Sequence, residues 1–260
     1  MKTNVFVKTK NVKNFVALME ELKKLPPNIP KITLVYGEYG LGKSETIKWW
    51  TFRNECIYVR ANQGMSTRWL LSDIAEELNI ETFWHIDETF NEIVKTLVKD
   101  RKTIIVDEVD YLIDKKTIET LRDLHDRTGC PLVLVGMANV NTKLARYPHL
   151  IDRIYKQYEF QKYKPEDIKQ ILEELTEVPF TADGLEYLST RENQFRQLVK
   201  LLNKIEKKAE TNQIKILDMI AVERLNGINN REGVENRNKM FKELLIANYP
   251  IKELYERQAD

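Results

Sequence analysis

The sequence predicts an α/β fold, in which a central, mostly parallel sheet of five strands is followed by a small helical lid domain. Short β-branched runs alternate with longer segments of helical period up to residue 160, and this alternation is typical of strands joined by crossover helices. The middle three runs are continuously apolar, which indicates strands covered on both faces. After Phe160 the strand signals cease and only helical patterns follow.

Each expected strand is a short run rich in β-branched residues. The five are Ile32–Tyr36, Ile57–Arg60, Thr103–Asp107, Leu132–Gly136 and Tyr155–Phe160. Helical periodicity predicts the connecting helices Lys43–Arg53, Ser66–Asn79, Glu88–Asp100 and Lys115–Thr128. The helices expected after the sheet are Pro165–Leu175, Thr181–Leu188, Asn193–Ala209 and Leu217–Leu225.

These elements divide the chain into four parts. Residues 1–30 form a lead-in, residues 31–160 the α/β domain, residues 161–225 the helical lid, and residues 226–260 a polar linker with a C-terminal helical tail. The helix expected in the tail carries apolar side chains that suit either the groove of a partner protein or packing on the lid.

The composition is that of a globular protein. Of the 260 residues, 42% are hydrophobic and 31% charged, with only 9 Gly and 8 Pro, which excludes disordered and collagen-like chains. The 41 Lys and Arg nearly balance the 40 Asp and Glu, so a nucleic-acid-binding surface requires a local excess of positive charge. Cys56 and Cys130 lack metal-ligand spacing and are expected to be buried free thiols. No apolar stretch approaches the ~20 residues that span a bilayer, so a cytoplasmic protein without membrane contact is expected.

A phosphate-binding loop is predicted between the first strand and the helix after it. The segment GEYGLGKS matches the pattern GxxxxGK[ST]. The glycines let backbone N–H groups converge on phosphate oxygens, Lys43 reaches the β- and γ-phosphates, and the Ser44 hydroxyl ligates Mg²⁺. The residues expected at the nucleotide are Gly37, Glu38, Tyr39, Gly40, Leu41, Gly42, Lys43, Ser44 and Glu45.

Two acidic residues, Asp107 and Glu108, end the third expected strand. Ligands of open α/β sheets bind at the carboxyl ends of the strands, so both carboxylates are expected beside the phosphates. In this interpretation Asp107 holds Mg²⁺ through water, and Glu108 polarises the water that attacks the γ-phosphate. The predicted cofactors are therefore ATP and Mg²⁺.

In these motifs the sequence resembles the AAA+ ATPases, a group of P-loop NTPases. The phosphate loop, the strand IIVDEVDYL, the strand LVLVGMAN and the helices behind them carry the resemblance, which covers most of residues 5–225. It implies ATPase activity, a γ-phosphate sensor at Asn139, an arginine finger for a neighbouring subunit at Arg153, and a second sensor at Arg196. Asn139 also suits a helix N-cap, Arg146 is the alternative finger, and either arginine also suits a surface ion pair.

Three shorter segments resemble one branch of that family, the regulators of transposition similar to the phage Mu B protein, TnsC and IstB. They are FVKTKNV from Phe6, YVRAN from Tyr58 and LVLVGMANV from Leu132. The resemblance implies a protein that binds duplex DNA with little sequence preference, self-associates into a ring or helical filament, selects target sites and recruits or activates a DDE transposase. Two alternatives remain open: a replicative-helicase loader of the IstB/DnaC type, and a nucleotide-gated switch with little hydrolysis.

Two segments are candidates for contact with DNA. The loop after the second strand lacks acidic residues and offers donors suited to phosphate oxygens. The third lid helix repeats basic residues at helical spacing, and residues 191–215 hold 7 basic and 3 acidic side chains, although a solvated helix face explains this pattern equally well. The candidate contacts are Arg60, Gln63, Thr67, Arg68, Lys200 and Lys204.

Overall fold

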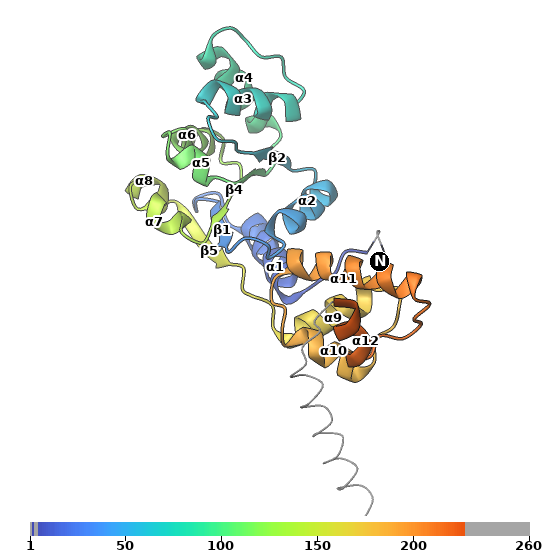
Figure 1. Cartoon of the computed structure of the whole chain (residues 1–260). Coiled ribbons are helices and arrows are strands. Elements are labelled where there is room, and N and C mark those ends of the chain that lie inside the picture. Colours follow the sequence, from blue (N-terminus) through green and yellow to red (C-terminus); the bar gives the residue numbers. More distant parts are fainter. Residues whose placement is uncertain (1, 3–4, 227–260) are drawn as a thin grey trace, which may run out of the picture.

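A parallel sheet of five strands forms the centre of the molecule (Figure 1). The computed structural model describes residue 2 and residues 5–226. The strands are β1 (Ile32–Gly37), β2 (Ile57–Arg60), β3 (Ile104–Asp107), β4 (Leu132–Met137) and β5 (Ile154–Glu159). Neighbouring strands are parallel, in the order β2-β3-β4-β1-β5. The predicted α/β fold is confirmed, and each strand lies within one residue of its predicted bounds.

Crossover helices connect the strands. They are α2 (Lys43–Asn54) after β1, α3 (Thr67–Glu77) and α4 (Ile86–Lys99) after β2, and α6 (Ile118–Thr128) after β3. Each corresponds to an expected helix, with ends displaced by at most three residues. Figure 1 places α3 and α4 together at one end of the molecule, beyond β2.

Four further helices lie in segments where the sequence analysis expected none. They are α1 (Lys10–Lys24), α5 (Asp110–Ile113), α7 (Val140–Leu144) and α8 (Pro148–Ile151). The last three have four or five residues, too few to display a helical period. In α1 the buried side chains of Val12, Phe15, Met19 and Leu22 recur every three or four residues beneath a lysine-rich outer face.

Helices cover both faces of the sheet. On one face, α1 and α2 pack Phe15 and Ile47 against Val35 and Ile105, in a core of buried apolar residues. On the other face, α3, α4 and α6 form a larger core with the remaining strand side chains. The positions of β3 are all buried, as its apolar run predicted, whereas β2 lies at the edge of the sheet and ends in the exposed Arg60.

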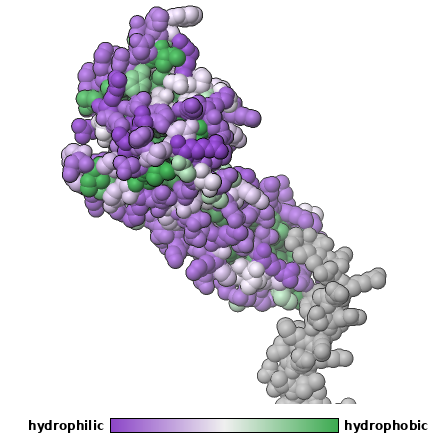
Figure 2. Space-filling model, turned by 90° about the vertical axis from the view of Figure 1, so that its left-hand side faces the viewer, coloured by the Kyte–Doolittle hydropathy of each residue, from purple (hydrophilic) through white to green (hydrophobic). Residues whose placement is uncertain are grey.

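The helices after the sheet pack around a core of their own. These are α9 (Pro165–Leu175), α10 (Ala182–Ser189), α11 (Phe195–Thr211) and α12 (Met219–Asn226), and they form the lid. They lie at the end of the molecule opposite α3 and α4 in Figure 1. Figure 2 shows a mostly hydrophilic face on which apolar side chains gather only in small groups. The linker and helical tail expected over residues 226–260 lie outside the described residues, apart from Asn226 at the end of α12.

The state of the two cysteines agrees with the sequence analysis. Cys56 and Cys130 are both buried and free. Within residues 5–226, no helix combines the length and apolar character needed to cross a membrane.

Candidate functional site

The phosphate loop lies between the end of β1 and the start of α2, the context that the sequence predicted. Gly40 and Gly42 have φ angles of +76° and +82°, left-handed values that glycine adopts without strain. The Lys43 side chain is buried, and its Nζ donates hydrogen bonds of 2.7 Å to the carbonyl oxygens of Gly37 and Glu38. Burial lowers the pKa of Lys43, while Asp107 and Asp110 oppose that shift. The loop therefore holds the Lys43 ammonium group against its own backbone carbonyls.

A hollow of about 480 Å³ opens in front of this loop. It brings together most of the predicted nucleotide-site residues, from the loop, from the end of β3 and from the lid helix α11. The lining includes Tyr39, Gly40, Leu41, Gly42, Lys43, Ser44, Glu45, Asp107, Glu108, Arg196 and Lys200. Lys200, predicted as a DNA contact, thus lines the same hollow as Arg196.

Both acidic residues at the end of β3 are bonded to the edge strand β2. Asp107 is 3% exposed, and its Oδ2 accepts a hydrogen bond of 3.2 Å from the Tyr58 hydroxyl. Glu108 has a left-handed φ of +56°, unusual for a residue other than glycine, and its Oε1 lies 2.6 Å from Nη2 of Arg60. Arg60, predicted to contact DNA, is therefore the ion-pair partner of Glu108.

A third carboxylate, which the sequence analysis did not single out, lies behind the two acids. Asp110 is buried, and its Oδ2 accepts a hydrogen bond of 2.8 Å from the backbone N–H of Met137 at the end of β4. Its Oδ1 is buried without a hydrogen-bond partner among the described residues. The hydrogen bond from Met137 to Asp110 fixes the end of β4 relative to β3. The sequence signal for Asp110 was its place three residues after Asp107, in the segment VDEVD.

The lid contacts the phosphate loop at two backbone oxygens. The N–H of Arg196, at the start of α11, donates to the Gly40 oxygen over 3.2 Å. The Tyr163 hydroxyl donates to the Leu41 oxygen over 2.8 Å. Arg196 therefore lies next to the loop, where the resemblance implied a second sensor.

The other two residues of the implied catalytic set lie further from the hollow. Met137 at the end of β4 lines it, whereas Asn139 is exposed and directly precedes α7. Arg153 follows α8, and its guanidinium bonds to Asp126 Oδ1 over 2.8 Å and to the His149 oxygen over 2.7 Å. Within one chain the Arg153 side chain is thus engaged in a surface ion pair.

The remaining candidates for DNA contact lie on exposed or half-buried surface. Arg68 donates to the carbonyl oxygens of Phe83, over 3.3 Å, and of Trp84, which joins the start of α3 to the segment before α4. Gln63 is exposed in the loop after β2, Thr67 is half-buried at the start of α3, and Lys204 is exposed on α11.

A smaller apolar hollow of about 140 Å³ adjoins the phosphate site on the far side of Gly42. Its walls come from the loop, from the N-terminal segment and from the lid, and both hollows include Gly42, Glu45 and Phe195. The N-terminal wall is fixed by Phe6, whose ring stacks on Trp49 of α2 with centroids 4.5 Å apart. No local sequence signal predicted this hollow, because its walls are far apart in the chain.

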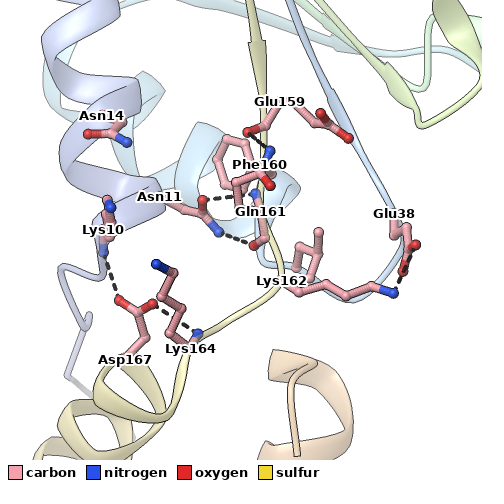
Figure 3. A pocket seen from close by; sticks show the side chains of 11 residues that line it. Lys10, Asn11, Asn14, Glu38, Glu159, Phe160, Gln161, Lys162, Lys164 and Asp167 are labelled. Atoms are coloured by element: carbon pink, nitrogen blue, oxygen red, sulfur yellow. Dashed lines mark hydrogen bonds and ion pairs between the residues drawn. The ribbon is translucent and has the colours of Figure 1, made fainter.

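A third hollow, of about 470 Å³, lies where the sheet passes into the lid (Figure 3). The Asn11 side chain bonds to both the N–H and the carbonyl of Gln161, over 3.1 and 2.8 Å. Lys162 pairs with Glu38 over 3.1 Å, so Glu38 points away from the phosphate hollow and toward this junction.

A family model and two curated proteins match parts of this chain. Residues 29–144 match the family model described as an AAA domain. The Mu-like prophage FluMu DNA transposition protein B of Haemophilus influenzae is 28% identical over 150 residues, which cover 54% of this chain and 52% of that protein. A potential ATP-binding protein of Staphylococcus aureus is 37% identical over 70 residues, or 27% of this chain and 26% of that one. This chain thus spans about half, or less, of the length of the curated relatives it matches.

Solved structures of similar fold include two ORC proteins of Aeropyrum pernix. The ORC2 protein of Aeropyrum pernix, in its ADPNP-ADP complexes, has a TM-score of 0.71 and 17% identity over 87% of this chain and 70% of that one. The ORC1 protein of the same organism, in complex with DNA, has a TM-score of 0.62 and 19% identity over 86% of this chain and 66% of that one. At this level of identity the likeness establishes the fold alone.

Proposed function

We propose that this chain, whose residues 29–144 form an AAA domain, binds ATP with Mg²⁺ and hydrolyses it. The observation that carries the proposal is the single hollow that contains the phosphate loop, the buried Lys43, both acids of β3 and Arg196. Cationic and anionic groups that converge in this way are those needed to bind phosphates and to orient an attacking water.

The donor set suits magnesium. The Ser44 hydroxyl and the Asp107 carboxylate line the same hollow and provide hard oxygen ligands, which Mg²⁺ prefers. Bound there, the ion would neutralise charge on the β- and γ-phosphates. Lys43 would exchange its bonds to the loop carbonyls for phosphate oxygens, and Glu108 would orient the attacking water. The smaller apolar hollow between Phe6 and Phe195 would take the base.

Three further residues complete the proposed catalytic set. Arg196 is positioned by its bond to Gly40 to contact the phosphates, and Asn139 would reach the γ-phosphate after movement of the β4 end. Arg153, with Arg146 as the alternative, would leave Asp126 and act on the nucleotide of a neighbouring subunit.

Substitution of the proposed base tests hydrolysis directly. Glu108→Gln should lower ATP turnover about 100-fold or more, because a positioned general base contributes that much, while ATP binding is retained. Glu88→Gln, at an exposed carboxylate on α4 at the other end of the molecule, is the control and should keep near wild-type turnover. A wild-type protein that binds ATP without measurable turnover would instead favour the nucleotide-gated switch.

We further propose that the chain acts on duplex DNA, as an ATP-dependent assembly that regulates a DDE transposase. The similarity to a protein named for DNA transposition supports this, as does the local basic excess over residues 191–215. Electron microscopy with ATP and duplex DNA should show oligomers that are absent without ATP. Failure to find any such oligomer would contradict the proposal, and stable binding to a replicative helicase would favour the loader.

The DNA contact has its own test. Lys204→Glu should weaken duplex binding and reduce its dependence on salt, because each phosphate contact adds to the number of counterions released. Lys95→Glu changes an exposed lysine on α4, at the other end of the molecule, and serves as the control. Equal affinity of the two variants would exclude α11 as the contact.

A further inference from the structure

The Tyr58 side chain lies along the same face of the sheet as Asp107. Tyr58 stands opposite Ile105 in the parallel register of β2 and β3, and side chains two residues apart on a strand share a face. The ring is half-buried and packs with the core beneath α2. From there its hydroxyl reaches past Ile105 to Oδ2 of Asp107, over 3.2 Å.

Asp107 is restrained at three atoms. Its backbone oxygen accepts from the N–H of Ala61 over 2.9 Å, its Oδ1 accepts from the N–H of Glu108 over 2.9 Å, and its Oδ2 accepts from Tyr58. Two of the three donors belong to β2 and the residue after it. A carboxylate oxygen can accept two hydrogen bonds, so both oxygens keep capacity for a water or a cation in the hollow.

We propose that Tyr58 is a positioning residue that fixes the Asp107 carboxylate for Mg²⁺. The inference rests on the proposed function, because it takes Asp107 as part of the magnesium site. The hydroxyl restrains rotation of a buried carboxylate whose other oxygen accepts from the backbone N–H of Glu108. Loss of the hydroxyl leaves the ring packing intact and allows the carboxylate to rotate, which weakens a site that depends on fixed oxygen positions.

Tyr58→Phe removes only the hydroxyl, and the chain offers a matched control. Tyr158 is also half-buried on an edge strand, and its hydroxyl bonds to the Asn11 side chain over 3.2 Å, far from the acids. Full-length wild type, Tyr58→Phe and Tyr158→Phe are titrated with Mg²⁺ in the presence of a fluorescent ADP analogue. Mn²⁺ binding followed by electron paramagnetic resonance gives a second readout that needs no turnover.

In Tyr58→Phe the half-saturating Mg²⁺ and Mn²⁺ concentrations should rise about tenfold, the low end of what losing a hydrogen-bond partner of a metal ligand costs. Nucleotide affinity in EDTA should stay at the wild-type value, and Tyr158→Phe should need no more metal than wild type. Equal metal requirements for Tyr58→Phe and wild type would overturn the inference, as would an equal rise in Tyr158→Phe.

A second variant separates this inference from the proposed function. In an Asp107→Asn background, which removes the carboxylate, adding Tyr58→Phe should change the metal requirement no further, because the two side chains act as a unit. An additional tenfold change would show that Tyr58 acts elsewhere and would overturn the inference. Wild-type nucleotide binding that is indifferent to Mg²⁺ would contradict the magnesium site itself, and both proposals with it.

Discussion

Lys43 and the two acids opposite it are held in place by different parts of the chain. Lys43 bonds to carbonyl oxygens five and six residues earlier, within its own loop. Asp107 and Glu108 bond to Tyr58 and Arg60, which are 49 and 48 residues away on the edge strand β2. The cation side of the site is therefore built locally, whereas the acid side depends on how the sheet is assembled. Substitution of Lys43 should therefore abolish most nucleotide binding. Substitutions in β2 should change the positions of the Asp107 and Glu108 carboxylates and have smaller effects.

The largest effect is expected from the locally built side. Lys43→Ala should weaken ATP binding about 100-fold or more, since it removes charge-assisted hydrogen bonds of roughly 1.5–3 kcal/mol each to the phosphates. Affinity for a fluorescent ATP analogue measures this. Lys48→Ala, at an exposed lysine one turn further along α2, is the control and should bind like wild type. Equal affinities for both variants would place the phosphates elsewhere.

A smaller effect is expected when the ion pair between β2 and Glu108 is removed. The Arg60–Glu108 pair is partly exposed, and such pairs contribute at most about 1 kcal/mol. Arg60→Ala should therefore raise basal ATP turnover, by up to about fivefold, because Glu108 no longer has to leave an ion pair. Steady-state turnover measures this, with Arg68→Ala as the control because that guanidinium bonds to backbone oxygens instead. Lower turnover in Arg60→Ala would contradict this expectation and would indicate that Arg60 takes part in ATP hydrolysis.

The smallest effect is expected from Phe6, and it tests whether the phosphate loop depends on the N-terminal segment. Phe6 lines the smaller hollow and stacks on Trp49, and an aromatic pair contributes roughly 0.5–1.5 kcal/mol. Phe6→Ala should weaken ADP binding about threefold. Phe52→Ala, which removes an exposed ring on α2, the helix of Trp49, should leave ADP binding unchanged. Calorimetric titration with ADP compares them. A loss as large as that of Lys43→Ala would mean that the loop depends on the N-terminal segment as much as on itself.

The same division explains what the sequence could predict. Each strand was predicted within one residue, because short apolar runs are local signals. The place of the predicted phosphate loop between a strand and a helix agrees with the structure, because its pattern lies within eight consecutive positions. By contrast, α1 was missed although its buried residues recur at helical spacing, a local signal that the sequence analysis left unused.

Interactions between distant residues could not be predicted in this way. Arg60 was assigned to DNA from the composition of its loop, and only the register of β2 on β3 reveals Glu108 as its partner. Tyr58 has no local motif, and its role follows from sharing a sheet face with Asp107. Phe195 and Phe6 form one hollow although the chain between them includes the whole sheet. Such pairs are fixed by topology rather than by neighbouring residues.

The strand order has a consequence for synthesis on the ribosome. β1 emerges first, yet its hydrogen-bonded neighbours are β4 and β5, which follow about 100 residues later. β2 and β3 pair with each other and can associate earlier. A nascent chain arrested before residue 132 therefore carries β1 with both of its edges unpaired, a state prone to cleavage and aggregation. We expect protease to cut residues 32–37 in chains arrested there and to spare them in chains that extend past β5.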